Sequence, residues 1–129
     1  MRLELTTRTD LALRGIRLLH SHGRRIKRAD LAEHLDTSPD FLARIMGPLV
    51  HRGWVISETG PSGGYQLDPS VRSVTVYDLI DCVEGVPSDD QCVLRGGPCD
   101  PTDRCALHDP WSRARKALVA ELQASFVID

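Results

Sequence analysis

The sequence predicts a mainly α-helical fold with one small β-hairpin, arranged as a winged helix-turn-helix followed by a long C-terminal helix. Three observations support this prediction. Apolar residues recur at three- and four-residue spacing through much of the chain, residues 54–67 switch to strand-like patterning around a glycine-rich turn, and Asp109-Pro110 opens a final amphipathic stretch. With 129 residues, 41% of them hydrophobic, the chain has the size and composition of one globular domain.

Two short helices are predicted near the start of the chain. Apolar spacing places them at about residues 10–22 and 27–35, with Thr7 and Thr9 as capping candidates for the first. A break at Asp36-Thr37 separates the second of them from the helix that follows.

A third helix is predicted to start after Ser38, a good N-cap, with Pro39 as its first residue. Proline inside a helix removes a backbone donor and costs about 3 kcal/mol, so Gly47-Pro48 predicts a kink or an early end. The short helix, the break and the capped helix together form the helix-turn-helix pattern. The residues expected to be buried by the third helix are Phe41, Leu42, Ile45, Leu49 and Val50.

A β-hairpin is predicted directly after these helices. Residues 54–57 and 65–67 are predicted to be strands, and residues 59–64 between them are of the types that favour turns. The hairpin completes a winged helix, to which we assign residues 1–74. Glycine leaves the backbone amides accessible to a phosphate, so Ser62, Gly63 and Gly64 are candidate phosphate contacts.

The net charge of -2 conceals a division along the chain: residues 1–60 carry about +3 and residues 61–129 about -5. A basic half suits the phosphate backbone of double-stranded DNA. A solvated loop would explain a short run of four basic residues equally well. In helix-turn-helix docking the third helix enters the major groove. The candidate DNA contacts are therefore Arg24, Arg25, Lys27 and Arg28 for phosphates, and Arg44 with Ser38, Pro39 and Asp40 for bases.

Residues 75–108 are assigned to a connecting helix and a cysteine-rich segment. Thr75 caps the helix, which ends at Gly85, and Cys82 inside it reads as a small packed residue rather than a ligand. Residues 86–108 show no periodicity and have little to bury. Something other than a hydrophobic core must therefore hold them.

The segment contains four potential ligands, Cys92, Cys99, Cys105 and His108, at C-x6-C-x5-C-x2-H spacing. The N-terminus lacks the apolar core of a signal peptide, so we expect a cytoplasmic protein whose thiols stay reduced and available to metals. Structural zinc sites usually use C-x2-C knuckles, which are absent here, whereas iron–sulfur clusters tolerate wider spacing. An iron–sulfur centre is favoured. A structural zinc site and a disordered acidic loop with free thiols remain as alternatives.

Residues 109–129 read as a long amphipathic helix with Trp111, Ala114, Leu118, Leu122 and Ser125 or Phe126 on one stripe. Because this helix follows the cysteine segment and lies far along the chain from the other helices, we favour a homodimer interface over intramolecular packing. No apolar run approaches the ~20 residues needed to span a membrane, so no membrane partner is expected.

Five motifs support a family resemblance: Met1-Arg2-Leu3, Thr9-Asp10-Leu11-Ala12-Leu13-Arg14, the wing at residues 60–67, Val83-Glu84-Gly85, and the cysteine segment closing in Cys105-Ala-Leu-His108-Asp-Pro-Trp111. With them, nearly the whole chain resembles the Rrf-type family of dimeric winged-helix transcriptional regulators. In IscR-like members a histidine three residues after the last cysteine is the fourth ligand of a two-iron cluster, and His108 matches it. In NsrR-like members a carboxylate from the partner's first helix completes a four-iron cluster, and Asp10 matches it.

The resemblance implies one 2Fe-2S or 4Fe-4S cluster per subunit, held by Cys92, Cys99 and Cys105 with either His108 or Asp10. It implies a DNA-binding repressor whose cluster senses nitric oxide, redox stress or iron–sulfur status. Ala43 stands where some members carry an acidic residue that discriminates DNA sites, so the operator sequence stays open.

Two other functional classes are alternatives. The first is a winged-helix protein with a structural zinc site, acting as a protein–protein or constitutive DNA-binding module. The second is an enzyme or electron carrier that uses the same cluster, but the sequence has no nucleotide-binding glycine motif and no nucleophile–base arrangement. We therefore expect a protein that is not an enzyme.

Overall fold

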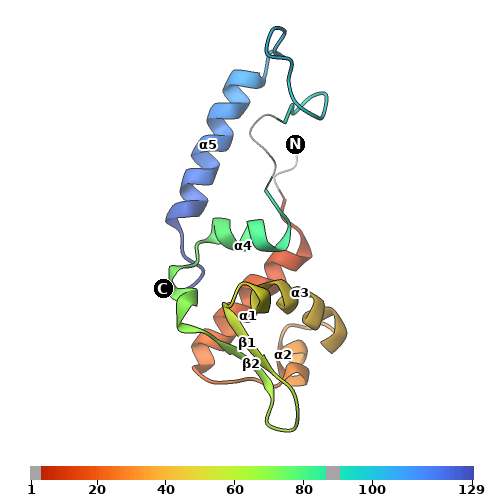
Figure 1. Cartoon of the computed structure of the whole chain (residues 1–129), viewed down its shortest axis with the longest axis vertical. Helices are drawn as coiled ribbons and strands as arrows, with labels where there is room; N and C mark the ends of the chain where they lie inside the picture. The colour runs from red at the N-terminus through yellow and green to blue at the C-terminus, as the bar shows by residue number, and fades with distance from the viewer. Residues whose placement is uncertain (1–3, 87–90) are drawn as a thin grey trace.

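The computed structural model describes residues 4–86 and 91–129, and its elements follow the predicted order (Figure 1). Three helices and a hairpin form a head, one helix crosses beside it, and the last helix reaches away from the head toward the cysteine segment. The elements are α1 Thr7–His22, α2 Arg28–His34, α3 Pro39–His51, β1 Val55–Glu58, β2 Gly64–Leu67, the 3-10 helix η1 Pro69–Ser73, α4 Val76–Val83 and α5 His108–Ala124.

The head is built around the apolar faces of its three helices, which pack together because α1 contacts α3 and α3 contacts α2. The helix-turn-helix prediction is confirmed by this packing. Of the five residues expected to be buried by α3, Leu42, Ile45 and Leu49 are buried, while Phe41 and Val50 are partly buried and pack against the core. The largest fully buried side chains of the whole core are Ile16, Leu31, Leu42, Met46, Leu49, Val55, Leu79 and Val127.

Helix α3 begins as predicted and continues past Pro48. The Ser38 hydroxyl accepts a hydrogen bond from the Phe41 N–H at 3.1 Å, and Pro39 occupies the first turn. A kink or an early end was expected at Gly47-Pro48, and of these two the early end does not occur, since the helix continues to His51. Part of the reason is Gly47, which has no Cβ to clash with the proline ring. The buried Leu49 also anchors the last turn.

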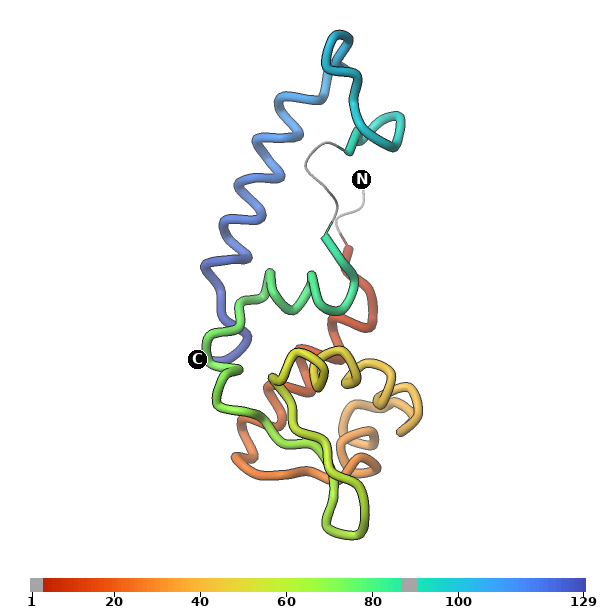
Figure 2. The backbone as a smooth tube through the Cα atoms, viewed as in Figure 1, coloured from red at the N-terminus to blue at the C-terminus, as the bar shows by residue number. Residues whose placement is uncertain are grey.

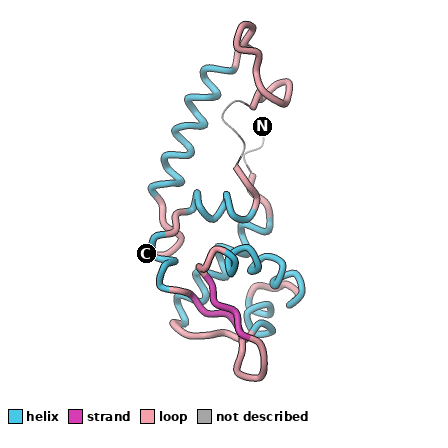
Figure 3. The backbone as a smooth tube through the Cα atoms, in the orientation of Figure 1, coloured by secondary structure: helices cyan, strands magenta, loops and turns pink. Residues whose placement is uncertain are grey.

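The wing is an antiparallel pair in which Val55 lies opposite Leu67 and Glu58 opposite Gly64 (Figure 3). The chain between α1 and α2 adds to its edge, because Ile26 and Tyr65 exchange backbone hydrogen bonds of 2.9 and 2.8 Å. The hairpin is thus held to the helices along its second strand.

Helix α4 is capped as predicted. The Thr75 hydroxyl accepts from the Asp78 N–H, and the Asp78 carboxylate accepts from the Thr75 N–H. Sequence reasoning missed η1, a short turn that starts at Pro69 and leads from the wing into α4.

The C-terminal end differs from the prediction. Helix α5 stops at Ala124, and the chain then turns back so that Val127 and Ile128 enter the core of the head (Figure 2). Backbone hydrogen bonds from Val76 to Ser125 and from Val127 to Val74 hold this tail. Burial of Val127 and Ile128 outweighs continuation of the helix, which would have left both side chains in water.

Helix α5 buries none of its own residues within the chain. Its stripe residue Leu118 is 53% exposed. Within the described residues, none of the helices combines the length and apolar character that crossing a membrane requires.

Candidate metal centre and nucleic-acid interface

Three of the four cysteines come together at the end of α5 that is remote from the head. The sulfurs of Cys92, Cys99 and Cys105 all lie within 4.8 Å of one another, and those of Cys92 and Cys105 are 3.7 Å apart. All three cysteines are free thiols, with Cys92 and Cys105 buried. Cys82 lies elsewhere, half-buried against the core of the head, and is not part of the cluster.

Tight turns bring the three thiols together. Gly96 and Gly97 adopt φ values of 69° and 63°, which side chains other than glycine rarely tolerate, and they return the chain so that the Cys92 N–H donates to the Gly97 carbonyl. A second turn is closed by Asp100, whose carboxylate accepts from the backbone and hydroxyl of Thr102 at 2.9 and 2.8 Å. Hydrogen bonds therefore shape a segment that has no hydrophobic core of its own.

Backbone N–H groups point at the sulfurs. The Arg95 N–H donates to the Cys92 sulfur and the Cys105 N–H to the Cys99 sulfur, both at 3.4 Å. The backbone hydrogen bond from Arg95 has the largest effect on Cys92 and that from Leu94 the next largest, and together they lower the pKa of the Cys92 thiol to about 7. Burial instead raises the pKa of the Cys105 thiol. Thiolates are the form that binds metal, and N–H···S bonds stabilise them.

His108, one candidate for the fourth ligand, lies next to the thiols but does not join them. It opens α5 and lines, with Cys92, Cys105 and Trp111, a cavity of about 10 Å³, room for about one water molecule. Among the described residues no fourth cysteine, histidine or carboxylate completes the three-sulfur group.

Asp10, the other candidate, lies in the first turn of α1. Its carboxylate is exposed and pairs with Arg14 at 3.3 Å. Within one chain the structure therefore brings neither candidate into the group of sulfurs. A donor set of three soft thiolates with N–H···S bonds fits an iron–sulfur cluster, with one coordination position left for another group.

Glu84, which sequence reasoning placed only in a family motif, joins the start of the cysteine segment to α1. Its carboxylate accepts hydrogen bonds from the hydroxyl of buried Thr9 and from the Thr6 N–H, the latter at 3.1 Å. Thr7 and Thr9 were the capping candidates, but α1 begins at Thr7 with Thr6 as its N-cap, and the Thr9 hydroxyl contacts the end of α4 instead. No local pattern signals a pair 75 residues apart.

The exposed side of α3 carries the predicted base contacts. Ser38, Pro39, Asp40 and Arg44 are all exposed at or after its N-terminus. In the described part of the chain, Arg44 makes no ion pair and no side-chain hydrogen bond. Its guanidinium is thus available to an incoming ligand.

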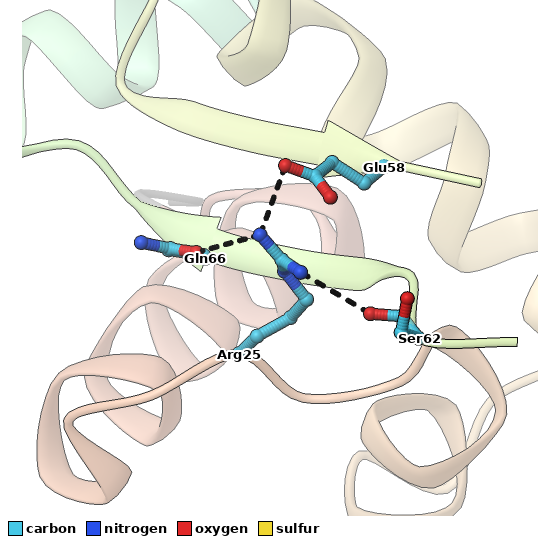
Figure 4. A network of polar contacts seen from close by, with 4 residues as sticks. All are labelled: Arg25, Glu58, Ser62 and Gln66. Carbon is cyan, nitrogen blue, oxygen red and sulfur yellow. Dashed lines mark hydrogen bonds and ion pairs between the residues drawn. The ribbon is translucent and has the colours of Figure 1, made fainter. Parts of the chain in front are cut away.

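The four basic residues between α1 and α2 differ from one another. Arg24, Lys27 and Arg28 are exposed, and Lys27 and Arg28 line an open cleft of about 340 Å³ between the start of α2 and the wing. Arg25 instead points back at the wing, where it contacts three residues (Figure 4).

The wing glycines are packed more closely than predicted. A Cβ on Gly64 would lie 2.3 Å from the Ile26 carbonyl oxygen, and one on Gly63 would lie 2.3 Å from that of Glu58. Both glycines are buried, and the Gly63 N–H already donates to Gly60. The residues left exposed at the tip are 59–62. The chain itself thus requires these two glycines, and contact with phosphate stays a prediction.

Comparisons with known proteins agree with this arrangement. The Rrf2 family model, described as iron-dependent transcriptional regulator, matches residues 5–127. The HTH-type transcriptional regulator IscR of Escherichia coli (strain K12 / DH10B) is 31% identical over 93 residues, covering 72% of this chain and 57% of that protein. The match thus spans little more than half of the relative's length.

Two solved structures share the fold. CymR, titled the global cysteine regulator of B. subtilis, has a TM-score of 0.76 at 26% identity, covering 98% of this chain and 94% of its own. An IscR from T. potens has a TM-score of 0.73 at 21% identity, with 97% and 83% covered. The winged-helix prediction is confirmed, and the proteins named are regulators rather than enzymes, as expected.

Proposed function

Because the chain belongs to the Rrf2 family of transcriptional regulators, we propose that it is a DNA-binding repressor of the cytoplasm whose affinity for promoters is set by an iron–sulfur cluster. The observation that supports this most strongly is the group of three thiols within 4.8 Å of one another, on a chain whose head is a winged helix. A metal-binding group remote from the reading head is what a ligand-controlled switch needs.

In this proposal Cys92, Cys99 and Cys105 hold one cluster per subunit. When bound, a cluster of the 2Fe-2S or 4Fe-4S type supplies a centre that reacts with nitric oxide or oxidants and that is lost when iron–sulfur supply falls. His108, beside the thiols, or Asp10 of a partner subunit fills the remaining position. Either ligand is protonatable and easier to displace than a thiolate, which makes that position the reactive one.

DNA binding is assigned to the exposed side of the head. Arg44 and the residues that start α3 read bases in the major groove, while Arg24, Lys27, Arg28 and the wing tip contact phosphates. The three basic residues are exposed and make no ion pair within the described chain, so binding DNA breaks no existing ion pair of theirs.

The dimer is assigned to α5. None of its residues is buried within the chain, and Leu118 is 53% exposed on its apolar stripe. A second copy packed along this helix would remove the stripe from water and would place two heads at a fixed separation for successive major grooves.

The route from cluster to DNA runs through α4. Glu84, two residues before the chain leaves for the cysteine segment, holds Thr6 and Thr9 at the start of α1, and Asp81 pairs with Arg52 at the end of α3 at 3.6 Å. A change in the cysteine segment that moves Glu84 would therefore shift α1 against α3.

A structural zinc site is the second candidate, and the position of His108 favours it. Three cysteines and one histidine form a zinc-binding donor set, and His108 shares a cavity with Cys92 and Cys105. In that case the metal would stabilise the segment without sensing anything.

Visible absorbance and metal analysis of protein purified without oxygen separate the two. The iron–sulfur proposal expects a brown protein with iron and sulfide, whose colour is lost in Cys92→Ser, Cys99→Ser and Cys105→Ser and kept in the matched control Cys82→Ser. A colourless protein carrying stoichiometric zinc would refute the cluster and support the structural metal.

A further inference from the structure

Arg25 differs from the basic residues around it in what its guanidinium touches. Nη1 donates to the Ser62 carbonyl at 3.2 Å, and Nη2 donates to the Gln66 side-chain oxygen at 3.1 Å and pairs with Glu58 at 2.9 Å. Figure 4 shows the guanidinium lying across the hairpin, with Glu58 on one strand and Gln66 on the other. One side chain thus reaches the first strand, the tip and the second strand of the wing.

The side chain of Arg25 is also less available to a ligand than those of its neighbours. It is 30% exposed, and its Nε is buried without a hydrogen-bond partner. Burying an unpaired N–H is unfavourable, so the three contacts made by the rest of the guanidinium must compensate for it. Arg24, Lys27 and Arg28 are exposed instead.

Burial of Val55 and Tyr65 in the core supports the base of the wing, but the strand ends and the tip, which lie farther from the core, have fewer contacts with the head. The wing's two strands have four residues each, and an isolated two-stranded hairpin is only marginally stable in water. The Ile26–Tyr65 backbone pair anchors its second strand beside the helices. Apart from this pair, Arg25 supplies the contact that reaches both strands and the tip.

We infer that Arg25 is a positioning residue that fixes the wing for DNA binding, rather than one of the phosphate contacts. This inference rests on the proposed DNA-binding function. The wing is then ordered before DNA binds, so the free energy of binding is not reduced by the entropic cost of ordering the wing. The planar fork of arginine can serve three acceptors at once, whereas the ammonium of lysine is a point charge that cannot reproduce that geometry.

The test compares Arg25→Lys and Arg25→Gln with Arg24→Lys and Arg24→Gln. The probe is a DNA duplex selected for binding to the wild-type protein from a random-sequence library. For a positioning residue, both Arg25 variants weaken binding by about three- to ten-fold, and the dependence of affinity on salt keeps its wild-type slope. For a phosphate contact, Arg25→Lys binds nearly as well as wild type, and Arg25→Gln reduces the slope by about 0.9. We expect the pattern of a phosphate contact for the Arg24 variants. If the Arg25 variants showed that pattern, the inference would be overturned.

Hydrogen exchange measured without DNA tests the anchor independently of function. Arg25→Lys should raise exchange at the amides of residues 55–58 and 64–67, leave the amides of α1 and α3 unchanged, and return to wild-type protection on the duplex. Glu58→Ala provides a second variant that removes one partner of Arg25 and should raise exchange at the same amides. Unchanged wing exchange in both variants would refute the anchor. Faster wing exchange in a protein that binds no duplex would leave the anchor standing and refute the proposed function.

Discussion

The chemistry of the proposed centre depends on a few atoms around three sulfurs. The Arg95 N–H and burial act in opposite directions, lowering the pKa of Cys92 and raising that of Cys105. Of these two thiols, that of Cys92 is thus partly ionised near neutral pH, while that of Cys105 stays protonated until a cation arrives. Positive charge at the centre favours both thiolates and offsets the cost of burying them.

The fourth ligand is decided by single substitutions. If Asp10 of a partner subunit completes the centre, Asp10→Ala changes the visible spectrum of the anaerobically purified protein and His108→Ala does not. The reverse result assigns His108. Asp109→Ala, beside His108 on α5, is the control and should leave the spectrum unchanged. If neither Asp10→Ala nor His108→Ala alters the spectrum, both assignments are wrong.

The residues of the centre and their grouping were predictable to different degrees. Spacing identified the three cysteines as a group and set Cys82 apart, because ligands of one centre tend to lie in one short segment. The contact between Thr9 and Glu84 was not predictable, since its partners are 75 residues apart and each fits a helix terminus equally well. Nor did the position of Arg25 in a basic run distinguish a wing contact from a phosphate contact.

At the scale of elements, the proposed route between the cysteine segment and the head passes through the end of α4. The Glu84 carboxylate accepts from two groups at the start of α1, and Thr9 is 4% exposed. Hydrogen bonds to a charged acceptor in a partly buried position are stronger than neutral ones. This contact is therefore a strong local tie between the segment and α1.

Removing the Thr9 hydroxyl tests this tie. Thr9→Val keeps the side-chain shape but removes the donor, so the cluster absorbance should persist while the ratio of DNA affinities with and without cluster falls toward one. Loss of a charge-assisted bond should also lower stability by about 1.5–3 kcal/mol, measured by urea unfolding. Thr7→Val is the matched control, because Thr7 lies two residues before Thr9 at the start of α1 and is exposed. An unchanged affinity ratio in Thr9→Val would exclude this route.

Element boundaries were predictable where local signals dominate. Ser38-Pro39 and the Thr75–Asp78 capping box place helix starts correctly because each satisfies free N–H groups locally. The end of α5 was not predictable, because Phe126 continues the apolar period while the core of the head takes Val127 and Ile128. Tertiary burial decided that boundary.

At the scale of the whole molecule, α5 extends from the head (Figure 1), none of its residues is buried, and Leu118 on its apolar stripe is 53% exposed. Fully burying one Leu side chain contributes roughly 1.5–3 kcal/mol, so covering Leu118 would favour a partner along this helix. The exposed stripe is the observation that supports the proposed dimer.

Leu118→Arg tests the dimer. Because Leu118 is 53% exposed in the single chain, the substitution should leave the head folded but place charge in the interface. Sedimentation should then show a monomer that binds a two-half-site duplex at least about ten-fold more weakly, since both heads no longer bind together. Gln123→Arg, exposed on the same helix, is the control for added charge. A dimeric Leu118→Arg protein would place the interface elsewhere.

Control of DNA binding by the metal centre is tested most directly by the affinity of one preparation for one selected duplex with and without its cluster. If the centre controls binding, the two affinities differ by about ten-fold or more, equivalent to at least about 1.4 kcal/mol of coupling. The difference should disappear in Cys92→Ser. Equal affinities for the two forms of the wild-type protein would contradict control by the metal centre.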